Sequence, residues 1–208
     1  TAGTWCAGQQ NRRVLCGALA VVVLVVMSVT AYRQTGFWKD TETMWNRALA
    51  CTSDNDTAHY NLGTSLLRDG RLDEAIVHFE KTLEANPGYV KAHINLGQAF
   101  LQKNMPDRAI EHYQKALAAR PSLPQAHYNL AVALEQKGRT DEAITHYRQA
   151  LEADPALFDA RLNLGSALLK AGRVDESIPE YEEALRISPG SAKAHHNLAT
   201  ALVEKGRI

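Results

Sequence analysis

Cysteine is scarce in this sequence, and the few cysteines exclude the structural roles that this residue usually has. Only three of the 208 residues are cysteines, Cys6, Cys16 and Cys51, and no two of them form a CxxC pair. An odd and widely spaced set fits neither a disulfide framework nor a zinc site. We therefore expect no metal site in this chain, and the cysteines identify no redox compartment.

An excess of charge is also missing. Lysine and arginine total 23 residues and aspartate and glutamate total 23, so the formal net charge is zero. A nucleic-acid-binding domain would present a basic stripe, so we expect no nucleic-acid partner. No nucleophile–base pair, phosphate-binding loop or carboxylate dyad stands out in the second part of the chain. We therefore expect no catalytic residue and no cofactor here. Because the chain begins with Thr1 rather than Met, we expect it to be a fragment or a processed product.

One long stretch carries no charge at all. Residues 14–31 read VLCGALAVVVLVVMSVTA, and as a helix they would span roughly 27 Å, close to the hydrocarbon core of about 30 Å. Basic residues precede the stretch, and Tyr32, Phe37 and Trp38 follow it like an interfacial belt. The sequence therefore predicts a transmembrane helix over residues 14–32, after a juxtamembrane segment over residues 1–13.

A secretory signal peptide is the alternative for the same stretch. Arg12 and Arg13 would be its basic region, and cleavage would follow Ala31. The apolar stretch is longer than the usual core of about 7–15 residues, which favours a retained helix. Because arginine or lysine lies at both ends, the charge distribution does not decide the orientation in the membrane.

The rest of the chain is organised by a period of 34 residues. Several kinds of residue recur with this step, and chance does not keep so many classes in phase. The recurring positions are Pro87, Pro121, Pro155 and Pro189; Phe79, Tyr113, Tyr147 and Tyr181; and Ala75, Ala109, Ala143 and Ser177. This period is that of a helix–turn–helix repeat, and strings such as AHYNLG and DEAI recur nearly verbatim.

The residue types at these positions have physical reasons. Small residues such as Gly63, Gly97 and Ala131 lie midway along the first helix of each unit, where the paired helix must approach closely. Glycines, with Asn104 in one unit, should end that helix in a left-handed backbone conformation. We expect Asp73, Asp107, Asp141 and Asp175 to cap the second helices. With Asp175 as the cap, Pro179 would remove at most the first hydrogen bond of its helix.

These repeats closely resemble the tetratricopeptide (TPR) family. The resemblance implies an all-α fold, a right-handed α-solenoid of helix pairs. With the apolar stretch, the predicted architecture is this solenoid preceded by one transmembrane helix. It also implies a protein or extended peptide as partner, bound in the concave groove lined by the first helices. The predicted divisions are a linker and partial repeat helix over residues 33–55, then an array over residues 56–208. The units of the array are 56–89, 90–123, 124–157, 158–191 and a truncated 192–208.

The junction between the apolar stretch and the repeats carries a narrower resemblance. The segment YRQTGFWKDTETMWNRAL, with Trp38, Asp40, Trp45 and Ala48-Leu49, resembles transmembrane-and-TPR proteins and bacterial glycosyltransferases of the protein O-mannosyltransferase type. In that family, catalytic residues lie in loops between early membrane helices and the repeats lie on the periplasmic or lumenal side. Two functions therefore stay open: a membrane-anchored scaffold, or the recognition end of a membrane glycosyltransferase.

The repeats are also similar to the TPR region of O-GlcNAc transferase, where an asparagine ladder holds the peptide backbone. The matching residues here are Asn61, Asn95, Asn129, Asn163 and Asn197. An amide suits this role because it offers a donor and an acceptor at fixed spacing. Local hydrogen bonding is the alternative role. The aspartate ladder of that family is matched only by Asp159, since the other units carry Thr57, Lys91, Gln125 and Lys193.

Histidines recur at two repeat positions, His59, His93, His127 and His195 at one, and His78, His112 and His146 at the other. Residues in phase on successive units are roughly 10 Å apart, given helix packing distances. Metal ligands must converge on one point, so we interpret these histidines as structural.

Overall fold

The computed structural model describes residues 41–52 and 55–206, and all of its regular elements there are helices. The chain divides into two compact units, residues 1–53 and residues 54–208. The described element of the first unit is α2, Thr41–Cys51, which lies within the linker and partial repeat helix predicted over residues 33–55. The predicted transmembrane helix over residues 14–32 lies outside the described residues. Among the described helices, none is both long and apolar enough to cross a membrane.

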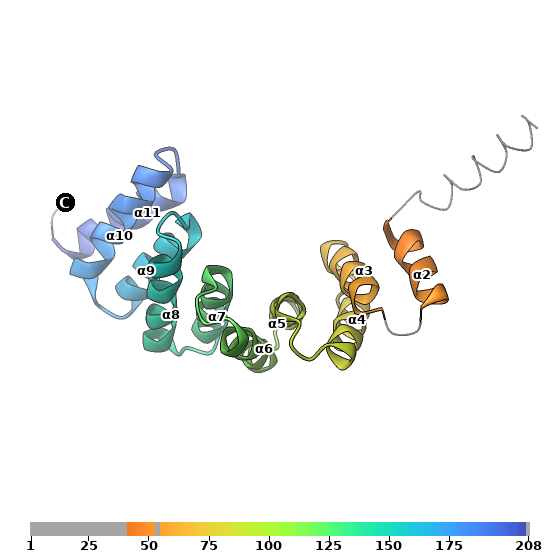
Figure 1. Cartoon of the computed structure of the whole chain (residues 1–208). Coiled ribbons are helices and arrows are strands. Elements are labelled where there is room, and N and C mark those ends of the chain that lie inside the picture. The colour runs from red at the N-terminus through yellow and green to blue at the C-terminus, as the bar shows by residue number, and fades with distance from the viewer. Residues whose placement is uncertain (1–40, 53–54, 207–208) are drawn as a thin grey trace, which may run out of the picture. The chain divides into compact units, whose positions relative to one another are not determined.

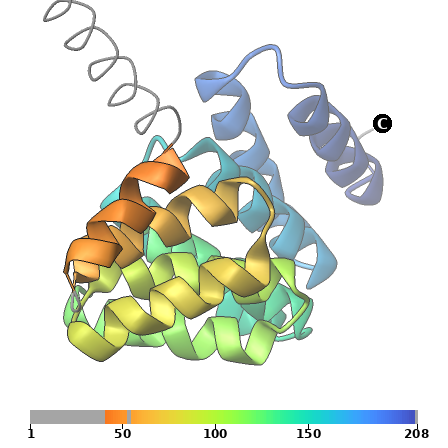
Figure 2. The same cartoon turned by 90° about the vertical axis from the view of Figure 1, so that its right-hand side faces the viewer.

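The second unit is a stack of helix pairs (Figures 1 and 2). Its first helices have 13 residues each and its second helices 14. The first helices are α3 (Asp56–Arg68), α5 (Val90–Gln102), α7 (Pro124–Gln136), α9 (Phe158–Lys170) and α11 (Ala192–Glu204). The second helices are α4 (Leu72–Ala85), α6 (Pro106–Ala119), α8 (Thr140–Ala153) and α10 (Val174–Ile187). An all-α solenoid, as the 34-residue period predicts, is what the described residues form.

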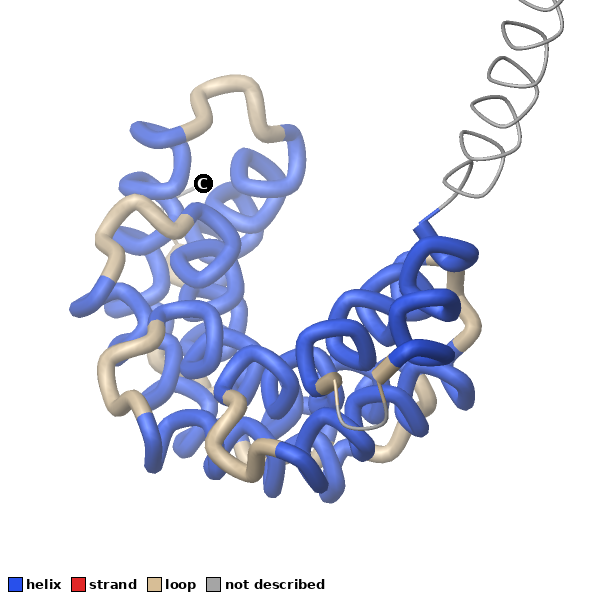
Figure 3. The backbone as a smooth tube through the Cα atoms, turned by 45° about the vertical axis from the view of Figure 1, so that its right-hand side comes forward, coloured by secondary structure: helices blue, strands red, loops and turns tan. Residues whose placement is uncertain are grey.

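Contacts between helices follow the order of the chain. Each second helix packs against its own first helix and against the first helix of the next unit. Successive first helices also touch, as α3 does α5 and α9 does α11. These contacts place the first helices on the inner side of the stack, whose curvature is seen in Figure 3. Short helices of this length are marginal alone, so their stability comes from these neighbour contacts.

In the core of each unit, an aromatic ring of the second helix packs against a small residue of the first helix. Phe79, Tyr113, Tyr147 and Tyr181 are fully buried. A Cβ added to Gly63 or Gly165 would lie within 2.9 Å of the ring opposite, and Ala131 fills the corresponding place in the third unit. The close approach predicted for these small residues is therefore confirmed. Left-handed turns are confirmed as well, with positive φ angles at Gly70, Asn104, Gly138, Gly172 and Gly206.

The predicted caps of the second helices are wrong. Each of these helices begins one residue before the aspartate, and the cap position falls on Arg71, Met105, Arg139 or Arg173, without a side-chain cap hydrogen bond. The aspartates occupy the second helical position, where their charge still favours the positive helix end. For the same reason Pro179 lies deeper inside α10 than predicted and removes the hydrogen bond to the carbonyl of Asp175.

The aspartates instead make ion pairs between units. Lys137, at the end of α7, lies 2.9 Å from Asp107 of the preceding unit, and Lys103 pairs with Asp73 and Lys205 with Asp175 in the same way. In the remaining unit Ala171 stands where the lysine would be. Asp73, Asp107 and Asp175 thus also stabilise the contact with the next first helix.

Candidate functional site

Three of the repeated asparagines bridge neighbouring first helices on the inner side of the stack. Nδ2 of Asn95 on α5 donates to Thr64 Oγ1 on α3 at 3.2 Å and reaches Tyr60 OH at 3.4 Å. Nδ2 of Asn163 on α9 donates to Tyr128 OH on α7 at 3.3 Å. These side chains are partly exposed. The sequence brings the asparagines onto one face, and the structure adds that they are linked to the unit before.

The pattern depends on which hydroxyl the preceding unit offers. Asn197 donates to Ser166 Oγ at 3.2 Å. Asn129 faces a unit that carries Ile94 and Gln98 at the equivalent positions, and its Oδ1 accepts from Gln125 Nε2 at 2.9 Å instead. Asn61 lies half-buried at the same position of α3. The sequence interpretation did not identify the hydroxyl groups that bond to these asparagines. They belong to Tyr60, Thr64, Tyr128 and Ser166.

The bridging bonds leave part of each amide for a ligand. Each of these bonds is made by the amide nitrogen, and Asn95 directs its nitrogen to two hydroxyls. Within residues 41–52 and 55–206, no donor contacts Oδ1 of Asn95, Asn163 or Asn197. An amide oxygen on each of these three side chains can accept from a peptide backbone N–H, so the arrangement can serve both local bonding and ligand binding.

The residues at the second position of each first helix lie beside this line and are all exposed: Thr57, Lys91, Gln125, Asp159 and Lys193. Gln125 is the one that bonds to an asparagine of the ladder, within its own helix. The pKa of Tyr128 is raised, first by burial of the phenol and then by the nearby carboxylate of Asp159. The charge along this edge of the groove therefore differs from unit to unit. These residues do not form a ladder of one residue type.

Glu135 is an exception in the third unit. It stands near the end of α7, where other units carry Leu67, Leu101 and Leu169. Its Oε2 accepts from Tyr147 OH at 2.6 Å, and burial together with this bond raises the pKa of Tyr147. In the second unit the hydroxyl of Tyr113 is buried without a partner among the described residues. The sequence signal for Glu135 is an acidic residue at a repeat position where these other units carry leucine.

A cavity of about 360 Å³ lies between α9 and α11 at the far end of this face. Ser166 is one of the residues that line it. The serine Oγ accepts from Asn197 and from Tyr181 OH, at 3.2 and 3.3 Å, and donates to the carbonyl of Leu162 at 2.9 Å. This hydroxyl is therefore already engaged. Leu169, Lys170 and Glu204 also line the cavity.

The two histidine series meet inside each unit, which the sequence interpretation did not foresee. His59 pairs with His78, His93 with His112, and His127 with His146, with Nδ1 atoms 2.9, 3.0 and 3.1 Å apart. The signal was present, because each pair is separated by 19 residues. Among the described residues no group of three or more histidine, cysteine or acidic side chains is arranged to hold a metal.

Comparisons with known proteins agree with the fold. The family model described as "Tetratricopeptide repeat" matches residues 26–90, 60–124, 94–158, 128–192 and 162–208. No curated protein matches the sequence.

Solved structures give further matches. The structure of YrrB, "a TPR protein with an unusual peptide-binding site", matches with a TM-score of 0.70 and 22% identity over 78% of this chain and 84% of that one. A MamA structure matches with a TM-score of 0.70 and 26% identity, covering 75% and 85%. MamA AMB-1 matches with a TM-score of 0.66 and 28% identity, covering 75% and 85%.

Proposed function

This chain belongs to the tetratricopeptide repeat family, and on that basis we propose that its array binds an extended peptide or protein segment along the inner face of the first helices. The observation that carries the proposal is the line of amides. Asn95, Asn163 and Asn197 are held in place by hydroxyls of the preceding unit, while their amide oxygens remain for a ligand. Fixed amides lose little freedom on binding, which favours affinity.

Recognition by main-chain hydrogen bonds makes the site tolerant of peptide sequence. Every peptide carries the same backbone donors and acceptors, so the amides alone select an extended conformation rather than particular side chains. Selectivity would come from the second helical positions, with Lys91 and Lys193 favouring acidic residues and Asp159 favouring a basic residue. YrrB, at 22% identity, supports the fold of this array and not the details of its ligand.

The test is replacement of Asn95, Asn129 and Asn163 by alanine. Peptides are first selected on the purified chain from a phage-displayed library of random decapeptides, and their affinity is then measured by fluorescence anisotropy. Each amide contributes roughly 0.5–1.5 kcal/mol, so the triple variant should bind about 10- to 1,000-fold more weakly.

The matched control removes the hydroxyl partners and keeps the amides. Tyr60→Phe, Thr64→Ala and Tyr128→Phe delete the bonds that Asn95 and Asn163 make to the preceding units. This control should bind the selected peptides within a few-fold of the parent. If the triple alanine variant melts well below the parent and binds equally tightly, the asparagines are structural and the proposal is wrong.

We also propose that residues 14–32 anchor the array in a membrane, with the repeats on the periplasmic or lumenal side. Support comes from the 18 uncharged residues and their aromatic flank. The full chain should then stay with the membrane fraction after carbonate washing, and a chain without residues 1–33 should leave it. Recovery of a soluble chain that starts after Ala31 would instead establish a cleaved signal peptide.

The second candidate function is substrate or partner recognition within a membrane glycosyltransferase. The junction residues Trp38, Asp40 and Trp45 favour it, because they match the transition from membrane helix to repeats in that family. The coding sequence upstream of Thr1 distinguishes the two candidates. About ten further apolar spans would support the glycosyltransferase, whereas a nearby start codon would support the scaffold.

A further inference from the structure

Three units of the array hold their two helices together through a pair of histidines. In each pair one ring comes from the first helix and the other from the second, with ring centroids 5.2 or 5.3 Å apart. The Nδ1 atoms are much closer than the centroids, so the two nitrogens lie between the rings and face each other. This is the geometry of one hydrogen bond with a proton between the rings.

A backbone carbonyl fixes where the protons lie. Nε2 of His93 is 3.1 Å from the carbonyl oxygen of Pro87, and Nε2 of His127 is 2.8 Å from that of Pro121. A carbonyl only accepts, so these Nε2 atoms carry hydrogen. In the neutral ring Nδ1 is then the acceptor, and His112 or His146 must donate from its own Nδ1. The His93–His112 and His127–His146 pairs, when neutral, are therefore directed chains from the second helix through the first helix to the turn.

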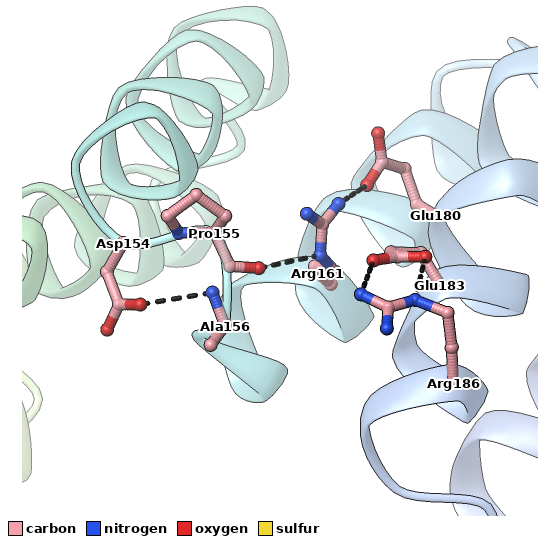
Figure 4. Close-up of polar contacts among 7 residues, drawn as sticks. All are labelled: Asp154, Pro155, Ala156, Arg161, Glu180, Glu183 and Arg186. Atoms are coloured by element: carbon pink, nitrogen blue, oxygen red, sulfur yellow. Dashed lines mark hydrogen bonds and ion pairs between the residues drawn. The ribbon is translucent and has the colours of Figure 1, made fainter.

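The fourth unit makes the same two connections with permanent charges (Figure 4). Arg161 stands at the position of the first histidine and Glu180 at that of the second. Nε of Arg161 donates to the carbonyl of Pro155 at 3.1 Å, and its Nη1 donates to Glu180 Oε2 at 3.1 Å. The two kinds of pair differ in their response to pH. An arginine–glutamate pair keeps its charges between pH 5 and 8, whereas the charge of a histidine pair can change in this range.

We propose that the array is a graded proton sensor, in which acidification loosens the helix pairs of the first three units and leaves the fourth in place. A neutral pair contains one proton on each ring. A proton added at Nδ1 of His93 or His127 would place two N–H groups against each other and break the bond between the helices. Protonation of the partner ring places a charge inside the helix pair instead.

The charged groups around the pairs do not cancel this effect. Near His93 and His112, Glu80 and Glu84 of α4 and Arg108, Glu111 and Lys115 of α6 line the adjoining cavity. Glu80 and Glu111 are already engaged, because Arg108 pairs with Glu80 and Lys115 with Glu111. Around the other pairs, Lys81 and Glu84 act on His59, and Glu142 acts on His146.

Burial is the main cause of the shifts in the histidines. It lowers the pKa of His112 to about 4, with the nearby His93 adding to the effect, and it lowers the pKa of His93, His59 and His146. The unfolded or opened chain therefore binds protons more readily than the closed helix pair. Below the ordinary value of 6.5, acid favours opening of these units.

The experiment is hydrogen exchange of the purified full chain at pH 7.5 and pH 5.0, followed by mass spectrometry and corrected for the intrinsic exchange rate. The opening constants of the pairs α3–α4, α5–α6 and α7–α8 should rise at pH 5.0, by up to tenfold per pH unit for each proton taken up. The pair α9–α10 should change less than threefold and serves as the internal control. Equal changes in all four pairs, or none in any, would overturn the proposal.

Two exchanges of side chains test the assignment directly. His93→Arg with His112→Glu copies the fourth unit into the second, and it should remove the pH response of α5–α6 while α7–α8 keeps its own. Arg161→His with Glu180→His is the reverse exchange, and it should give α9–α10 a response. If either variant fails to fold, the imidazole resonances of the unmodified chain decide. A pKa of His112 near 6.5 in an NMR titration contradicts the proposal, and a value well below it supports the proposal.

Discussion

Gly97 lies directly beneath the ring of Tyr113, so close that a Cβ at the glycine would be 2.6 Å from Cε1 of the tyrosine. The ring is fully buried and cannot tilt away without opening the contact between α5 and α6. The corresponding contact in the first unit uses a phenylalanine at 2.9 Å. The distance between paired helices is thus set by a glycine on one and an aromatic ring on the other.

Gly97→Ala should destabilise the array by about 1–3 kcal/mol, because the added methyl overpacks a buried contact. The loss should appear despite the better helix propensity of alanine, which is worth up to about 1 kcal/mol. Gly190→Ala is the matched control, since nothing lies within 4 Å of a Cβ there. Urea denaturation followed by circular dichroism measures both variants. Equal stability of the two would mean that the ring yields at little cost.

Ala143→Leu should lower the free energy of unfolding by about 1–3 kcal/mol. Ala143 is fully buried on α8 at a position that is alanine or serine in every complete unit. The same substitution at Ala153, exposed at the end of α8, should change stability by less than about 0.5 kcal/mol. A neutral result at Ala143 would show that this contact has room that its burial does not indicate.

Ala171→Lys should add the ion pair that the fourth unit lacks, with Asp141 as the partner. Lysines at the equivalent positions 103, 137 and 205 all pair with the aspartate of the preceding unit. These pairs are largely exposed, so the expected gain is only about 0.2–1 kcal/mol. It should disappear in 1 M salt and with Asp141→Asn, measured as a change in denaturation midpoint. A gain that persists in salt would point to packing rather than charge.

The free energy of unfolding should fall with pH below the ordinary histidine value. His112 has its pKa lowered from 6.5 to about 4 by burial, so the unfolded chain binds more protons than the folded chain between these values. Stability is fully present above pH 6.5 and is lost as pH falls towards 4, by no more than about 3 kcal/mol for this group. Guanidinium titrations at pH 7, 6, 5 and 4 check the slope. A flat profile for the parent chain would contradict it.

The fold was predictable from the sequence because a repeat imposes the same packing problem in each unit. Residues such as Tyr113 and Pro121 recur every 34 positions, and the period itself identifies the helix pair. The caps were not predictable from composition. Aspartate is common both at the cap and inside the first turn, and only the interunit lysine at 103, 137 or 205 shows which role applies.

The candidate site was predictable in position but not in its connections. Asparagine at 61, 95, 129, 163 and 197 follows from the period. Its partners depend on hydroxyls one unit away, at Tyr60, Thr64, Tyr128 and Ser166, and a hydroxyl does not recur at these positions in every unit. The histidine pairs were missed for the opposite reason. Histidines of one series lie a repeat apart along the stack. The contact is made between the two series, inside one unit.

The proline carbonyls have a consequence for cutting and exchanging these units. A graft that begins just after Pro87 separates the acceptor from His93, the ring that bonds to it, and from His112 behind that ring. A segment over residues 87–120 carries all three parts together and ends before Pro121 starts the next set. The block that can be exchanged as a unit therefore does not have the boundaries of a helix pair. It begins at one repeat proline and ends at the residue before the next repeat proline.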